Sequence, residues 1–178
     1  EQSATRSEDT EVAVKVVEVE EAEFSSPFTG DLDSPPLDVE SFDANGDGID
    51  EIVVLFDGAP GGIACFDISE DGAPVQIAGF TSTVGNAPVD LDVADLNGDG
   101  YDDVIVANGA SNTVSVLTTV VGTDGALSFD PEVVLSISAT STCIAIIDWD
   151  GDTELDAVVG IDIAESTLQD GYRVLLDV

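Results

Sequence analysis

The chain has 178 residues, of which 43% are hydrophobic, and a formal net charge of −35. That apolar content is enough for one domain with a real core, so the acidity does not indicate a disordered tail. Because only Arg6, Lys15 and Arg173 could neutralise phosphates, nucleic acid is excluded as a partner and anionic membrane surfaces are disfavoured. No apolar run is long enough for a membrane span, so we expect no membrane insertion.

Residues 1–35 form a predicted N-terminal segment with one strand and a linker. Within about 11–24, valines alternate with charged residues, which is typical of a strand with one buried face. The linker that follows is rich in Ser, Pro, Gly and Asp. The chain opens on Glu1 and shows no signal peptide, and we expect a mature, processed N-terminus.

Residues 36–178 form the predicted main domain, which consists of three repeats. The stretch that begins at Asp43 returns at Asp95, 52 residues later, and more loosely at Asp148, 53 residues after that. The repeats span about 36–84, 85–138 and 139–178. A period of this length with several strands per unit indicates propeller blades or a β-solenoid.

Four strands per repeat favour the propeller blade. The first repeat offers strands at 37–42, 51–56, 62–68 and 75–80, and the second at 89–94, 103–107, 113–121 and 127–137. The third offers only 142–147, 156–161 and 172–178. We therefore predict an all-β fold of three four-stranded blades, in which the N-terminal strand of the same or a neighbouring chain completes the last blade.

Three blades are fewer than the roughly four to eight of typical propellers. The chain could form an open arc, a small ring, or an assembly in which other copies supply the missing blades. Strand donation that does not close would build a filament. We rank a homo-oligomer or polymer above a lone monomer.

The turn between the first two strands of each repeat has the chemistry of a metal loop. Oxygen-bearing side chains occupy positions 1, 3, 5 and 9, and the carbonyl of position 7 would face the same centre. Gly48 and Gly100 at position 6 permit the left-handed backbone that such a loop needs, whereas Thr153 replaces this glycine in the third copy. Hard oxygen ligands without soft ones suit calcium.

Two other interpretations of these loops are an EF-hand and a simple hairpin turn. An EF-hand requires a bidentate Glu at position 12 and flanking helices, but Val54, Val106 and Val159 stand there between β-branched runs. Asn-Gly and Asp-Gly are strong turn dipeptides without any metal. Three copies that all keep acids at positions 1, 5 and 9 favour the metal.

At these loops the chain resembles the FG-GAP/VCBS repeat family, whose signature is Asp-x-Asn/Asp-x-Asp-Gly-x-x-Asp before an apolar strand. The second copy matches fully, the first has Glu51 for the last Asp, and the third lacks the glycine. The similarity covers roughly residues 36–178. The resemblance implies calcium-binding β-propeller blades, as in integrin α-subunit heads and many secreted bacterial proteins. It implies adhesion, scaffolding or carbohydrate binding more often than catalysis.

The loop chemistry and the resemblance together predict about three Ca²⁺ ions. In each loop the residue at position 7 contributes its carbonyl and the others their side chains. The predicted ligands are Asp43, Asn45, Asp47, Ile49 and Glu51 in the first loop, Asp95, Asn97, Asp99, Tyr101 and Asp103 in the second, and Asp148, Asp150, Asp152, Glu154 and Asp156 in the third.

We expect a secreted, calcium-stabilised structural or adhesion protein, outside the cell or on its surface, that self-assembles by N-terminal strand exchange into a filament or ring. The alternative is a module that binds carbohydrate or a cell-surface protein, with Trp149, Tyr101 and Tyr172 as candidate sugar-stacking rings. A polysaccharide-active enzyme ranks below both, because the chain has no histidine and no nucleophile–base set. We predict no enzymatic activity.

Composition leaves two further points open. The self-repulsion of 38 acids must be relieved, and bound calcium or a high-salt, halophilic or marine setting would both do so. An acidic surface that serves solubility alone is an equal alternative. Cys65 and Cys143 lie in apolar runs, which favours burial. A bridge within the chain, a bridge between chains and free thiols are all compatible with one cysteine pair.

Overall fold

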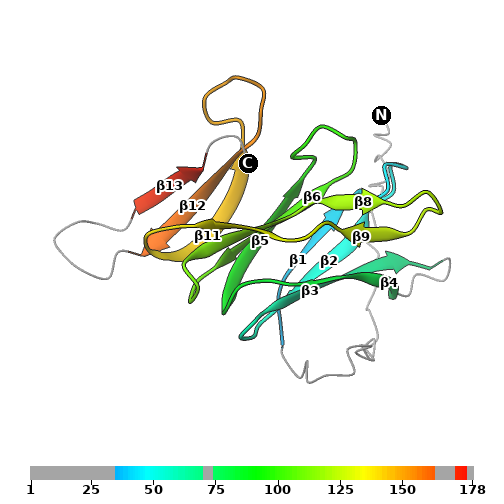
Figure 1. Ribbon diagram of the computed structural model, residues 1–178, viewed down its shortest axis with the longest axis horizontal. Coiled ribbons are helices and arrows are strands. Elements are labelled where there is room, and N and C mark those ends of the chain that lie inside the picture. The colour runs from blue at the N-terminus through cyan, green and yellow to red at the C-terminus, as the bar shows by residue number, and fades with distance from the viewer. Residues whose placement is uncertain (1–34, 70–73, 163–170, 176–178) are drawn as a thin grey trace, which may run out of the picture.

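The protein is described here by a computed structural model covering residues 35–69, 74–162 and 171–175, the last range by its backbone alone. These ranges form antiparallel strands and contain no helix, so the predicted all-β class is confirmed (Figure 1). In particular, they contain no helix that is long and apolar enough to cross a membrane. The strand predicted at 11–24 lies outside the described residues, and its exchange stays a prediction.

Sheet one is a four-stranded meander in the order β1-β2-β3-β4. The predicted strands at 51–56 and 62–68 are confirmed at both ends. The strand predicted at 37–42 begins one residue earlier, and the one predicted at 75–80 extends to 74–83. The sheet is apolar on both faces near its middle, since Val53 and Val54 are both buried. Its strands are β1 (Pro36–Phe42), β2 (Glu51–Phe56), β3 (Gly62–Ile68) and β4 (Pro74–Thr83).

Sheet two is also four-stranded, in the order β10-β7-β6-β5. Two predictions were wrong here, because the single strands expected at 113–121 and 127–137 are each broken in two. Only residues 113–117 of the first and 133–136 of the second belong to this sheet. Its strands are β5 (Pro88–Ala94), β6 (Asp103–Asn108), β7 (Thr113–Leu117) and β10 (Val133–Ser136).

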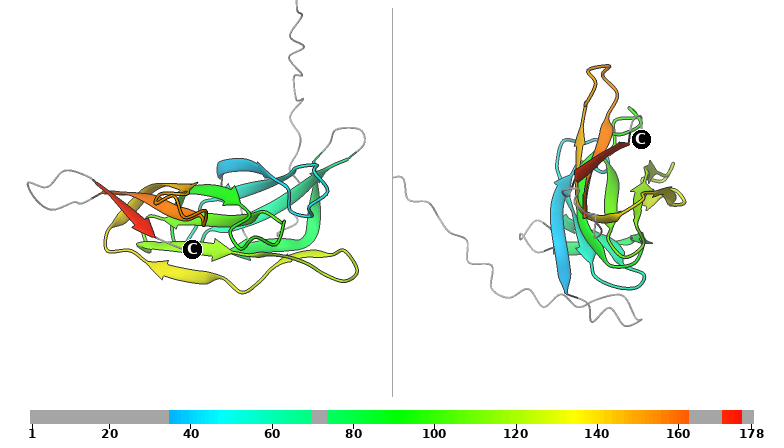
Figure 2. Two further views of the ribbon diagram at one scale, coloured as in Figure 1. Left: turned by 90° about the horizontal axis from the view of Figure 1, so that it is seen from above. Right: turned by 90° about the vertical axis from the view of Figure 1, so that its left-hand side faces the viewer.

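The other two halves form a separate hairpin of β8 (Thr119–Val121) and β9 (Leu127–Phe129). Where the chain leaves sheet two, the Asp103 carboxylate accepts the Thr119 backbone N–H at 2.8 Å. Pro131, which has no N–H, separates β9 from β10. The hairpin then packs against β4, where the rings of Phe80 and Phe129 lie 4.4 Å apart (Figures 1 and 2).

Sheet three contains three strands within the described ranges, in the order β11-β12-β13. They are β11 (Thr140–Ile147), β12 (Asp156–Asp162) and β13 (Gly171–Leu175). The sequence predicted this shorter sheet. As a result, β13 stands at the sheet's edge, where its outer backbone groups face no described strand.

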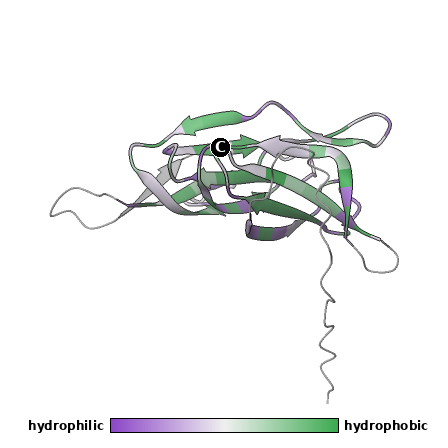
Figure 3. Ribbon diagram, turned by 90° about the horizontal axis from the view of Figure 1, so that it is seen from below, coloured by the Kyte–Doolittle hydropathy of each residue, from purple (hydrophilic) through white to green (hydrophobic). Residues whose placement is uncertain are grey.

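Two apolar cores hold the three sheets side by side. The first joins sheets one and two through residues such as Leu55, Phe80 and Val106, and the second joins sheets two and three through Ile105 and Val159. Figure 3 shows the apolar colouring of the strands that enclose these cores. Adjacent residues of β6 face opposite cores, so sheet two is the middle layer that both neighbours need for burial.

The first strands of the sheets also lie side by side and share a repeated hydrogen bond. Asp38 on β1 accepts the backbone N–H of Leu91 on β5 at 3.2 Å. One repeat later, Asp90 on β5 accepts the N–H of Ile144 on β11 at 2.8 Å. Burial raises the pKa of Asp90, and its neighbours Asp38 and Asp92 raise it further. An aspartate at the equivalent position of the first strand therefore links sheet one to sheet two and sheet two to sheet three.

Both cysteines lie in the described part of the chain, and neither forms a disulfide there. Cys65 is buried, as predicted, and burial raises the pKa of its thiol. The expected burial of Cys143 was wrong, because this residue is exposed. It alternates along β11 with Ile144, which faces the second core, so Cys143 points away from that core.

Candidate metal centre

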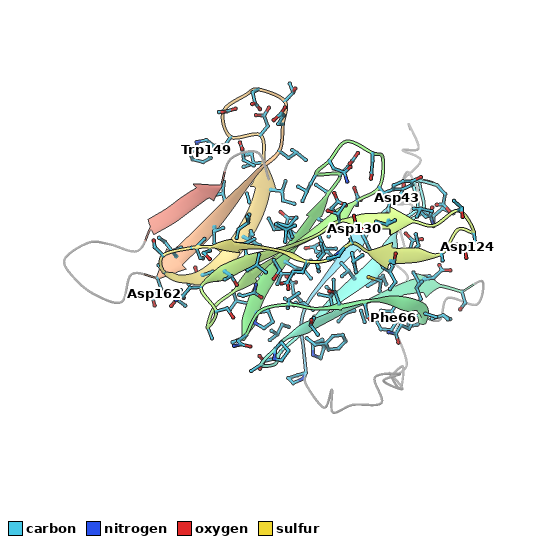
Figure 4. The ribbon with its side chains drawn as sticks, viewed as in Figure 1. Asp43, Phe66, Asp124, Asp130, Trp149 and Asp162 are labelled. Carbon is cyan, nitrogen blue, oxygen red and sulfur yellow. The ribbon has the colours of Figure 1, made fainter. Side chains whose placement is uncertain are left out.

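The three predicted metal loops each join the first two strands of a sheet, and all lie along one edge of the molecule (upper edge in Figure 1). Figure 4 labels Asp43 in the first loop and Trp149 in the third, at opposite ends of this row. The third loop projects beyond the other two, and its Trp149 is 49% exposed. The loops follow from the sequence, because Gly-Asp-rich turns interrupt β-branched runs at the same point in each repeat.

In the first loop, the carboxylate at position 1 organises the backbone. One oxygen of Asp43 accepts the N–H groups of Gly46 and Asp47 at 2.8 and 3.2 Å, and the other accepts that of Gly48 at 2.9 Å. The Asn45 amide oxygen accepts the Asp47 N–H, and the Asp47 carboxylate accepts that of Ile49. Side chains 1, 3 and 5 thus turn into the loop, as a metal site needs.

The second loop repeats this pattern bond for bond. Asp95 accepts three backbone N–H groups, Asn97 accepts that of Asp99, and Asp99 accepts that of Tyr101. The third loop keeps four of these five bonds, with Asp148, Asp150 and Asp152 as acceptors. Three sequence copies therefore give three loops that share four of these backbone-to-side-chain hydrogen bonds, which form the internal frame of each loop.

The frame requires left-handed backbone at positions 4 and 6. Position 4 is glycine in all three loops, and position 6 has φ of 81° at Gly48 and 91° at Gly100. Thr153 adopts the same conformation with φ of 80°, although a β-branched residue is strained there. The third loop thus keeps its shape without the glycine, and the carboxylate bonds must offset the strain.

The acid at position 9 is buried in every loop and fastens the base of the turn. Glu51, Asp103 and Asp156 are at most 5% exposed. Each accepts the backbone N–H of position 2, at 3.0, 3.2 and 2.8 Å respectively. Since a carboxylate oxygen has two lone pairs, these bonds leave acceptor capacity for a cation.

One acid in each loop has a raised pKa, chiefly because of burial and further because of nearby carboxylates. The pKa of Asp103 rises to about 6, chiefly through burial and also through the charges of Asp99 and Asp95, while backbone hydrogen bonds oppose the rise. Burial and neighbouring acids likewise raise the pKa of Glu51. In the third loop, desolvation and three nearby carboxylates raise the pKa of Asp150. A divalent cation would relieve this repulsion in each loop.

The residues present fit calcium by their donor atoms. Asp148, Asp150 and Asp156 each bring one carboxylate oxygen within 4.8 Å of the others. The first two loops carry Asn at position 3 instead of an acid, and Asn45 also donates its amide N–H to Glu51 at 2.6 Å. The third loop therefore concentrates more negative charge, while the first two have the more relaxed backbone.

A comparison with known families matches the same segments to a repeat family. The chain matches the FG-GAP-like repeat over residues 43–106 and again over 95–159. The chain belongs to the FG-GAP-like repeat family. Such repeats are typical of extracellular, adhesion-type modules rather than enzymes, and they often bind Ca²⁺. None of the curated proteins compared with the chain matches it.

Sequence reasoning missed the residues that connect one FG-GAP loop to the next. Asp102 at position 8 of the second loop accepts the N–H of Asp43 at 2.9 Å. Thr119, at the start of β8, donates its hydroxyl to the Asp102 carbonyl at 2.6 Å and its N–H to Asp103. Asp50 occupies position 8 of the first loop, so the local pattern could not tell which of the two acids makes the contact.

Replacing Thr153 with glycine should stabilise the protein by about 1 kcal/mol, because glycine adopts φ of 80° without strain. Urea denaturation gives the free energy of unfolding. The opposite change, Gly100→Ala, should cost about the same amount. An added Cβ there meets no atom within 4 Å, so only the backbone is affected. Equal stability of Thr153→Gly and wild type would contradict the strain.

Proposed function

We propose that this protein is a calcium-stabilised, extracellular structural or adhesion module of β-propeller-like architecture. The observation that carries the proposal is the shared frame of the three loops. In each loop, the position-1 carboxylate accepts backbone N–H groups, and the buried acid at position 9 accepts the N–H of position 2. Family membership supports the same conclusion.

The loop residues would hold calcium with distinct tasks. Side chains at positions 1, 3 and 5 and the carbonyl at position 7 would supply most oxygens, while the buried acid at position 9 would close the site from below. Bound calcium supplies positive charge among carboxylates that otherwise repel. Its role is to fix one turn per sheet, which couples metal binding to folding.

The arrangement of the sheets supports blades that continue beyond one chain. Sheets one, two and three stack through their first strands, as successive propeller blades do, and sheet three has one strand fewer within the described ranges. A strand from residues 11–24 could pair with the edge of β13, in the same chain or a neighbour's. Donation to a neighbour would build the oligomer or filament that the sequence predicts.

Direct calcium binding tests the first part of this proposal. Equilibrium dialysis followed by metal analysis should find about three Ca²⁺ ions per chain in the millimolar range expected of extracellular sites. Replacing Asp47, Asp99 or Asp152 with alanine should remove about one ion each. Asp67→Ala, which removes an exposed acid outside the loops, should remove none. Equal loss from Asp67→Ala would indicate diffuse counterion binding and refute specific sites.

A further inference from the structure

Loop one and loop two touch each other, and two reciprocal hydrogen bonds define the contact. The Asp102 carboxylate of loop two accepts the N–H of Asp43 in loop one at 2.9 Å. In return, the N–H of Asp102 donates to the Asp43 carbonyl at 3.0 Å. Asp43 is position 1 of its loop, so the bonds reach the residue that organises loop one.

Asp102 holds an equally central place in loop two. It lies between Tyr101, whose carbonyl oxygen is the predicted calcium ligand at position 7, and Asp103, the acid at position 9. Thr119 fixes this segment from outside, through its hydroxyl on the Asp102 carbonyl and its N–H on the Asp103 carboxylate. The two hydrogen bonds therefore join position 1 of loop one to a residue that stands between two predicted ligand positions of loop two.

Side-chain packing strengthens the contact. A Cβ added at Gly46 would lie 3.1 Å from a ring carbon of Tyr101 and 3.1 Å from the Gly100 carbonyl oxygen, so loop one seats directly against loop two. Tyr101 and Asp102 are both only partly exposed. Partial burial makes these bonds less sensitive to competition from water than bonds on an open surface.

Loops two and three provide an internal comparison. In loop three, position 8 is Leu155, whose side chain has no hydrogen-bond acceptor. Gly98, which corresponds to Gly46, has no atom within 4 Å of an added Cβ. Within the described residues, neither the carboxylate bond nor the ring packing is repeated between these two loops. The hydrogen bonds and the ring contact that join loops one and two are therefore not reproduced between loops two and three in the part of the chain that the structure describes.

We propose that the calcium sites of loops one and two bind cooperatively through Asp102, whereas the site of loop three binds independently. This inference rests on the proposed calcium function. Filling loop one fixes Asp43 and, through it, residues 101–103, so loop two loses less conformational freedom when it binds in turn. Linkage makes the effect reciprocal, and couplings of this kind begin at about fivefold in affinity.

The test reads each loop separately by NMR. The backbone amides of Gly46, Gly98 and Gly151 occupy position 4 of the three loops and donate to the position-1 carboxylate, so their shifts report calcium in each loop. Loop one is disabled by Asn45→Ala with Asp47→Ala, which leaves the Asp43 backbone in place. The calcium midpoint of Gly98 should rise about fivefold, while that of Gly151 stays unchanged.

A double-mutant cycle assigns the effect to Asp102. In an Asp102→Leu background, which copies the residue of loop three, disabling loop one should leave the Gly98 midpoint unchanged. Asp50→Leu is the matched control, because it removes the same charge at position 8 of loop one, where the side chain is exposed and no cross-loop bond is found. That background should behave like wild type.

Two results would overturn the inference and are distinguishable. If all three amides respond to calcium but the Gly98 midpoint ignores the state of loop one, the loops bind calcium independently and only the coupling is wrong. If no amide responds at tens of millimolar calcium, the calcium function fails and the coupling fails with it. The comparison with loop one disabled needs no Asp102 variant, so it stands even where Asp102→Leu does not fold.

Discussion

Removing calcium with a chelator at low salt should lower the melting temperature by roughly 10 °C. A site at a calcium concentration about ten times its dissociation constant stabilises the folded state by about 1.4 kcal/mol. For a chain of this size, each kcal/mol shifts the melting temperature by about 2–4 °C. Three loops therefore add up to a large shift, which differential scanning calorimetry can measure.

Salt and magnesium separate specific binding from general screening. High NaCl weakens the repulsion among 38 acids without filling the loops, so it should restore only part of the lost stability. Magnesium demands stricter octahedral geometry and gives up water reluctantly, so it should restore less than calcium at equal concentration. Full recovery in NaCl alone would favour a salt-dependent acidic protein over a calcium-dependent one.

The metal-free protein should also be more stable near pH 5 than near pH 7. The folded-state pKa of Asp103 is about 6, above its ordinary value of 3.8, because of burial. The folded protein therefore binds more protons than the unfolded chain between these values, and stability falls as the pH rises through 6. Calcium should reverse this trend, since it binds the ionised carboxylates. A flat profile in chelator would contradict the raised pKa.

Local patterns predicted most strands and all three loops, because both depend on residues close together in the chain. β2 and β3 match their predicted ranges since turn residues bound apolar runs at both ends. The break between β7 and β8 could not be predicted in this way. At this break the Thr119 N–H bonds to the Asp103 carboxylate, 16 residues earlier, and a pattern of neighbouring residues does not reveal such a contact.

The local sequence pattern also could not predict the contacts between repeats. Asp50 and Asp102 occupy the same position of a nearly identical motif, yet only Asp102 bonds to another loop. The difference arises because loop two has a preceding loop to contact and loop one, within the described residues, does not. Cys143 illustrates the same limit, since its apolar run favoured burial but only one face of β11 meets a core.

Deleting residues 1–24 should abolish assembly while leaving the calcium loops intact. Sheet three has three strands within the described ranges and ends at β13, so a strand from residues 11–24 of a neighbour would extend it through backbone hydrogen bonds. Without that strand, light scattering and electron microscopy should show a monomer in place of rings or filaments. The alternating valines of the segment supply the apolar face that such a strand needs.

The same deletion distinguishes donation from closure within one chain. A strand exchanged between chains belongs to neither of the apolar cores that the described residues form, so the truncated protein should still melt cooperatively and respond to calcium. If the strand instead pairs within its own chain, the truncated protein should be a misfolded monomer. Adding a peptide of residues 11–24 to the truncated protein should cap β13 without restoring polymers. Assembly that persists after the deletion would rule out strand exchange as its cause, because the donated element would be gone.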